Sequence, residues 1–133
     1  MEILAESKKY IVFYEFESVI LKIKKSKKEI LIGDFYGEPQ MALISEKEDF
    51  CAMCGCGIIV YYLHSPFIEY AYHKRTKQWK EWKRGKNEEI VWIENIKYIS
   101  DSILEIKTDL GEKISINPYS FSVIENLYDR RKK

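Results

Sequence analysis

Three cysteines lie close together in the chain and are its clearest candidates for metal chemistry: Cys51, Cys54 and Cys56. The first two have the Cys-x-x-Cys spacing of a zinc knuckle, and Gly55 would leave backbone amides free to approach the thiolates. A tetrahedral zinc site needs four ligands, however, and the sequence contains no second knuckle. His64 is the nearest alternative ligand, but an extended strand over 57–63 would place it about 20 Å from Gly57, at about 3.3 Å per residue. We therefore predict buried, reduced cysteines and no metal or other cofactor.

Basic residues surround two tryptophans between positions 74 and 86: Lys74, Arg75, Lys77, Lys80, Lys83, Arg84 and Lys86, with Trp79 and Trp82. Aromatic rings among cations can stack the bases of single-stranded nucleic acid. Charges elsewhere cancel this segment, since 22 Lys and Arg face 21 Asp and Glu for a formal net charge of +1. The simpler interpretation is an exposed hairpin or helix whose tryptophans pack inward. A single-stranded nucleic-acid-binding module over 74–86 is the alternative function.

A second segment combines acidic residues with two aromatics that we expect to be exposed. Its candidate partner-binding residues are Asp34, Phe35, Tyr36, Glu38, Glu46, Glu48 and Asp49. Carboxylates steer the encounter with a basic partner, and buried aromatic anchors then hold it. The segment therefore predicts a docking site for a basic protein, and an ordinary solvated loop region is the simpler alternative.

The two histidines, His64 and His73, lie in none of the motifs that support hydrolytic catalysis. Neither belongs to a Gly-x-Ser-x-Gly elbow or a His-Glu-x-x-His helix, and no glycine-rich phosphate loop is present. Glu15 and Glu17 would share one face of a strand, but an alternation of this kind is typical of a solvated strand face. The sequence therefore predicts a protein without enzymatic activity.

Short strand-like runs occur at 10–16, 19–24, 29–32, 41–44, 50–53, 57–63, 90–93, 103–106 and 114–116. The run at 57–63 is almost wholly apolar, so we expect a central strand covered on both faces. Residues 109–112 contain the glycine of a tight hairpin, and helical spacing over 122–131 predicts a short terminal helix. The pattern predicts one mainly β domain over 1–133, an antiparallel sandwich, roll or barrel with at most one or two short helices.

The sequence favours neither export nor membrane insertion. The N-terminal residues lack the positive region and long apolar stretch of a signal peptide. The longest uncharged run, 51–66, is too short for a membrane helix and contains glycines, a histidine and a proline. An odd number of crowded cysteines argues against a disulfide framework. We therefore expect a cytoplasmic protein that does not enter a membrane.

Several stretches together resemble a known type of protein: residues 32–39 and 42–45, Cys51, residues 55–57 and the strand-like run 58–63. They are similar to small bacterial proteins of the immunity type, which accompany polymorphic or contact-dependent toxins. The resemblance covers residues 30–93. It implies a non-enzymatic cytoplasmic protein whose partner is a cognate toxin, neutralised when the toxin's active site is covered. The family shares no catalytic motif, so the resemblance assigns no individual site residue.

Overall fold

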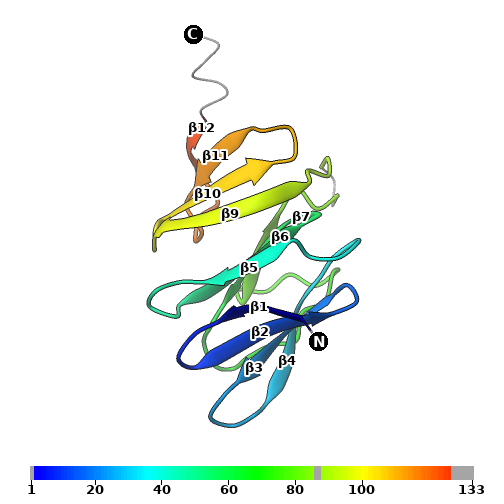
Figure 1. Ribbon diagram of the computed structural model, residues 1–133, viewed down its shortest axis with the longest axis vertical. Coiled ribbons are helices and arrows are strands. Elements are labelled where there is room, and N and C mark those ends of the chain that lie inside the picture. The colour runs from blue at the N-terminus through cyan, green and yellow to red at the C-terminus, as the bar shows by residue number, and fades with distance from the viewer. Residues whose placement is uncertain (1, 86–87, 127–133) are drawn as a thin grey trace.

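The computed structural model describes residues 2–85 and 88–126, which form three stacked four-stranded antiparallel sheets (Figure 1). The first sheet contains β1 (Glu2–Glu6), β2 (Tyr10–Glu15), β3 (Ser18–Ile23) and β4 (Glu29–Asp34). The central sheet contains β5 (Met41–Ile44), β6 (Phe50–Gly55), β7 (Gly57–Tyr62) and β8 (Trp79–Trp82). The third sheet contains β9 (Ile93–Ser100), β10 (Ile103–Thr108), β11 (Lys113–Ile116) and β12 (Val123–Asn126). Consecutive strands pair in each sheet, so its connections alternate between its two ends.

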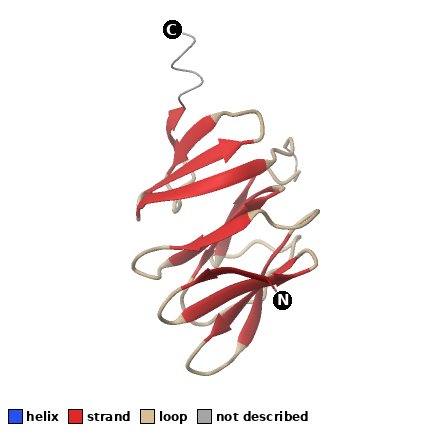
Figure 2. Ribbon diagram, viewed as in Figure 1, coloured by secondary structure: helices blue, strands red, loops and turns tan. Residues whose placement is uncertain are grey.

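The elements of regular secondary structure in the described residues are all β-strands (Figure 2). The prediction of a mainly antiparallel, sandwich-like β fold is therefore confirmed. Residues 2–85 and 88–126 contain no helix that is long and apolar enough to cross a membrane.

The central sheet is covered on both of its faces. β6 and β7 are buried along their whole length. Successive side chains of a strand point to opposite faces, so Cys51 and Met53 pack against the first sheet while Ala52 and Cys54 pack against the third. Burial on both sides favours an apolar residue at each position. This explains the uninterrupted apolar run at 57–63 and confirms the central strand expected there.

Each outer sheet buries one face against the central sheet. In β3, Val19 and Leu21 are fully buried in the core, whereas Lys22 lies on the opposite face. In the third sheet, β10 and β11 form the hairpin expected around the glycine turn, and Leu104 pairs with Ile116. Burial of a single face explains the period-two alternation in these segments.

A terminal helix was predicted over 122–131, and this prediction is wrong for the part of the segment that the structure describes. Val123–Asn126 form a strand that pairs with β11. A turn precedes this strand, and within it the Asn117 carbonyl oxygen accepts a backbone hydrogen bond from Phe121 at 2.8 Å. The edge of β11 offers backbone partners to the returning chain, and this pairing overrides the helical spacing of the side chains. Residues 127–131 lie outside the described part of the chain.

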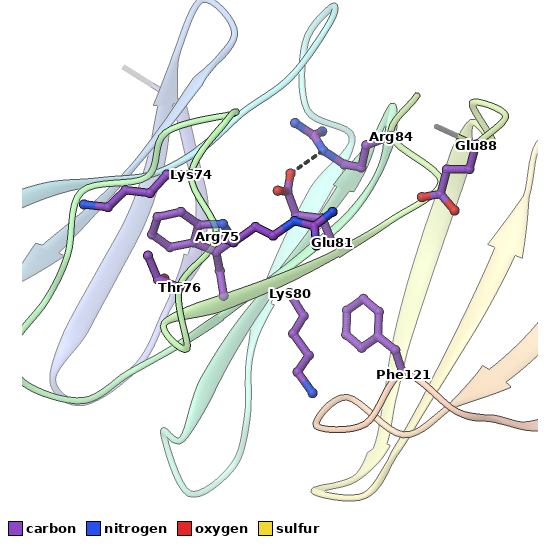
Figure 3. Close-up of a pocket in the computed structure, with 9 residues that line it drawn as sticks. Lys74, Arg75, Thr76, Lys80, Glu81, Arg84, Glu88 and Phe121 are labelled. Carbon is purple, nitrogen blue, oxygen red and sulfur yellow. Dashed lines mark hydrogen bonds and ion pairs between the residues drawn. The ribbon is translucent and has the colours of Figure 1, made fainter. Parts of the chain in front are cut away.

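Arg84, just after β8, is a buried arginine whose guanidinium group joins the first and central sheets. Nη1 donates to the Cys56 carbonyl oxygen at 2.9 Å, and Nη2 donates to the carbonyl oxygen of Asp34 in the first sheet. Nε lies 2.9 Å from the Glu81 carboxylate (Figure 3). The Tyr70 hydroxyl accepts from Nη2 at 3.2 Å and donates to Glu81 at 2.5 Å. Each guanidinium nitrogen therefore has a partner, as a buried charge requires.

Replacing Arg84 should show how strongly this network holds the two sheets together. Arg84→Met should lower the free energy of unfolding by about 3–5 kcal/mol, because it removes the buried cation that bonds to the Glu81 carboxylate and to two carbonyl oxygens. Urea denaturation measures the loss. The double variant Arg84→Met, Glu81→Leu should recover part of it, since no buried charge remains. A loss of less than about 1 kcal/mol in the single variant would contradict the structural role of the ion pair.

Candidate functional site

One end of the stacked sheets gathers loops from all three sheets, on the right-hand side of Figure 1. These connections are 16–17 after β2, 35–40 after β4, Cys56 after β6, 83–92 after β8 and 109–112 after β10. We call this surface the loop end. In an antiparallel meander every second strand runs in the same direction, so these strands end at the same edge of the sheet. Their connections therefore lie together at this end.

Short contacts connect these loops into one continuous surface. The Gly37 amide donates to the Glu17 carboxylate at 2.8 Å, which ties the loop after β4 to the turn after β2. The Cα of Gly37 faces the Trp92 ring so closely that a Cβ atom there would lie 3.5 Å from it. The Asp109 amide donates to the Trp92 carbonyl oxygen at 3.0 Å. Loops connected to the first and third sheets therefore contact one another at the loop end.

Large apolar side chains are exposed on four of these five connections: Phe16 (88%), Tyr36 (77%), Ile90 (51%), Trp92 (39%) and Leu110 (87%). They are five of the eight large hydrophobic residues that are exposed in the described residues. Single exposed apolar residues are common on protein surfaces, but several on adjoining loops mark an interaction site.

Carboxylates surround these apolar side chains. Exposed acidic residues of the loop end are Glu15, Glu17, Asp34, Glu38, Glu88, Glu89 and Asp109. Lys83 Nζ lies 3.6 Å from the Glu89 carboxylate, and the positive charge of Arg84 is buried against Glu81. Among the described residues of the loop end, carboxylates therefore outnumber cations, which include the exposed Lys113, and this balance favours the approach of a positively charged partner.

A cavity of about 400 Å³ opens at the same end. Its walls include Glu17, Asp34, Tyr36, Tyr72 and Ile90. The guanidinium group of the buried arginine lies in the wall as well, but its nitrogens already bind groups of the protein. The cavity thus combines carboxylates with apolar surface, and the buried Cys56 also contributes to its lining.

The structure divides the predicted acidic site between the two ends of β5. Asp34, Tyr36 and Glu38 are exposed at the loop end, whereas Glu46, Glu48 and Asp49 lie in the turn between β5 and β6 at the opposite end. β5 separates the two groups because the chain enters this strand at one end of the sheet and leaves it at the other. Only the first group can act together with the apolar residues of the loop end.

Phe35 is buried, contrary to the expectation that both aromatics of this segment are exposed. Its exposed fraction is 3%, and its ring lies 4.6 Å from the Arg84 guanidinium carbon. The ring belongs to the core between the first and central sheets. The cation and the apolar core both favour burial of Phe35, so its side chain supports the loop from below and cannot serve as a surface anchor.

The Glu48 carboxylate forms hydrogen bonds within the fold. It accepts hydrogen bonds from the Ser7 hydroxyl at 2.5 Å and from the Lys9 amide at 2.9 Å. The Ser7 hydrogen bond and then the Lys9 amide lower the pKa of this carboxyl below its usual value. The residue therefore fixes the turn between β1 and β2 against the turn between β5 and β6.

The tryptophans of the basic segment lie in β8, and the first of them packs inward. Trp79 is 4% exposed, and its ring lies 5.1 Å from that of Tyr70. A cavity of about 380 Å³ beside β8 is lined by Lys74, Arg75 and Lys80 among other residues (Figure 3). Cations are thus present beside this strand, but the buried Trp79 ring cannot stack on a base.

The Cys-x-x-Cys spacing does not bring its two thiols together. Cys51 belongs to the core between the first and central sheets, whereas Cys54 belongs to the core between the central and third sheets. Because the two residues are an odd number of positions apart in one strand, their side chains lie on opposite faces. This pair cannot bind one metal ion in the described fold.

Sequence reasoning missed four of the apolar residues at the loop end: Phe16, Ile90, Trp92 and Leu110. Two of them carried a signal. Phe16 lies between two glutamates where a hairpin turns, and Leu110 lies within the predicted glycine turn. A large apolar side chain in a tight turn cannot reach the core of the sheet, so it faces solvent or a partner. Trp92 and Ile90 resembled ordinary strand residues.

The buried thiols should be unreactive in the folded protein. Burial raises the pKa of Cys51 above its usual range and raises the pKa of Cys54 to about 12. A thiol reagent at neutral pH should therefore modify these cysteines only after unfolding. Protein purified without a chelator should hold less than one equivalent of zinc. One tightly bound equivalent that is lost in the Cys51→Ser, Cys54→Ser variant would contradict this prediction.

Glu48 should make the stability of the protein depend on acidic pH. Because the pKa of Glu48 is lower in the folded state, its carboxylate stabilises the fold at pH values above the ordinary glutamate pKa of 4.5. This contribution is lost as pH falls through the folded pKa. Glu48→Gln should therefore lower the urea midpoint at pH 7, and the difference should shrink progressively as the pH falls below that of the unfolded carboxyl. Glu46→Gln is the matched control in the same turn. An equal loss at all pH values would refute the assignment.

Comparison with known proteins does not assign a function to this chain. No protein-family model matches the chain, and no curated protein matches it either. The exposed apolar residues and carboxylates of the loop end therefore carry the functional argument.

Proposed function

We propose that this chain is a non-enzymatic binding protein of the immunity type, which neutralises a cognate bacterial toxin by occluding its active site. One observation carries the proposal: exposed apolar side chains from loops of all three sheets lie together at the loop end within a rim of carboxylates. An apolar centre with a charged rim is the arrangement of protein–protein interfaces. The loose resemblance to immunity-type proteins supplies the kind of partner.

Hydrogen bonds between loops of the loop end support a role in tight binding. Backbone hydrogen bonds such as Asp109 N–H to Trp92 O hold these loops to one another. Below them, the Arg84 network fixes the carbonyl groups of Asp34 and Cys56. A surface that is ordered before the encounter loses less conformational entropy on binding.

The charge of the loop end distinguishes this proposal from nucleic-acid binding. Carboxylates repel a phosphate backbone and attract a basic protein surface. A toxin that itself binds phosphate groups would carry such a basic surface, and carboxylates would compete for it. Neutralisation of this kind takes place in the cytoplasm, where the toxin would otherwise act.

The proposal predicts rescue of growth and direct binding. Expression of the toxin encoded beside this gene should arrest growth, and coexpression of the chain should relieve the arrest. With purified, catalytically inactivated toxin, Asp34→Lys, Glu38→Lys should slow association by about tenfold or more and weaken its dependence on salt. Biolayer interferometry at several salt concentrations measures both effects.

The turn at the opposite end of β5 provides the matched control. Glu46→Lys, Asp49→Lys makes the same change in charge away from the loop end and should leave association within about twofold of the unmodified protein. The proposal fails if coexpression gives no relief. It also fails if the chain binds only single-stranded nucleic acid and Lys74→Ala, Arg75→Ala abolishes that binding.

A further inference from the structure

Phe16 occupies a backbone conformation that disfavours a bulky side chain. Glu15 and Ser18 pair across the end of the β2–β3 hairpin, so Phe16 and Glu17 form its two-residue turn. The φ angle of Phe16 is 58°, in the left-handed region. Turns with this geometry favour glycine or asparagine, because the Cβ atom of other residues crowds the backbone. An aromatic residue at this position therefore destabilises the fold.

The packing of the molecule does not compensate for this strain. The Phe16 side chain is 88% exposed and belongs to neither hydrophobic core found in the described residues. A ring that stays exposed on folding contributes no burial free energy to offset the strain. The strained backbone of Phe16 is therefore uncompensated by packing within the chain.

Other residues with positive φ contrast with Phe16. Lys27 and Glu48 carry charged side chains suited to a solvated turn, and Phe121 is half-buried against the core between the central and third sheets. In the described part of the chain, Phe16 is the residue that combines positive φ with an aromatic ring turned to solvent. Strained residues of this kind occur at functional sites.

The surroundings of Phe16 define the chemistry of its partner. Glu15 and Glu17 flank it in sequence, and the Glu17 carboxylate holds the amide of Gly37 at 2.8 Å. That contact places the turn beside Tyr36, which is 77% exposed. The ring therefore projects from a surface in which apolar groups alternate with carboxylates.

We infer that Phe16 is the anchor of the loop end and inserts into an apolar recess, rimmed by lysine or arginine, on a basic protein partner. This inference rests on the proposed function and names the surface that the partner must present. Burial of the ring in the complex would recover the free energy that its exposure costs, and the cationic rim would pair with Glu15 and Glu17.

Membranes and nucleic acids fit this surface less well. An exposed aromatic ring can enter a lipid interface, but the adjoining carboxylates are repelled by anionic headgroups. The same carboxylates are repelled by phosphate groups of nucleic acid. A basic protein with an apolar recess satisfies both the ring and its charged neighbours.

The test separates the stability of the turn from its function. Phe16→Gly should raise Tm by about 3 °C, because glycine relieves the left-handed strain and no buried contact is lost. The same variant should weaken binding to the inactivated toxin by about tenfold or more, mainly through faster dissociation. Lys27→Gly is the matched control: its φ is 63°, and it lies in the β3–β4 turn at the other end of the sheet. It should be no less stable than the unmodified protein and should retain full binding.

Each alternative result has a distinct meaning. A fall in Tm for Phe16→Gly would show that the ring stabilises the fold and would overturn the inference. Unchanged binding by Phe16→Gly, with binding lost in Tyr36→Ala and in Asp34→Lys, Glu38→Lys, would also overturn it while the proposed function stands. Absence of toxin binding by the unmodified chain would overturn both.

Discussion

The buried guanidinium group of Arg84 is the interaction on which the arrangement of the loop end depends. It lies among apolar side chains, yet it binds the Glu81 carboxylate and the carbonyl oxygens of Cys56 and Asp34. Two of these partners belong to the central sheet and one to the first, so a single planar group sets the spacing between two layers. Because a buried charge without partners is very unfavourable, the sheets cannot shift without breaking several charge-assisted hydrogen bonds together.

The three-layer stack explains which features could be predicted from the sequence. A sheet covered on both sides requires apolar residues at successive positions, and β6 and β7 satisfy this requirement. A sheet covered on one side needs an apolar residue at every second position, as β10 shows. These are local patterns, so β2 to β7, the β10–β11 hairpin and the mainly β fold were predictable, whereas β1, most of β9 and β12 were not among the predicted strands. The order of the layers depends on contacts between distant segments, and no local pattern contains it.

The candidate site was predicted only in part, for the same reason. Glu38 and Glu46 lie close in sequence, yet β5 places them at opposite edges of the central sheet. The burial of Phe35 depends on Arg84, whose bond to the Asp34 carbonyl spans 50 residues. Clustering of charge along a sequence indicates a site only when no strand separates the members of the cluster. Turn residues are more informative, because a turn fixes which end of a sheet its side chains occupy.

The near-neutral composition conceals a separation of charge within the first sheet. Glu15, Glu17 and Asp34 lie at the loop end. The turns at the other end contain six lysines: Lys8, Lys9, Lys24, Lys25, Lys27 and Lys28. The Lys24 amide donates to the Lys9 carbonyl oxygen at 2.9 Å, so these two basic turns are adjacent. A basic protein would be attracted to one end and repelled from the other, which orients it before contact. For the proposed partner, this orientation brings its basic surface to Phe16 and Tyr36 rather than to the opposite turns. The charge separation therefore raises the fraction of encounters that are productive, while the apolar residues determine how long the complex lasts.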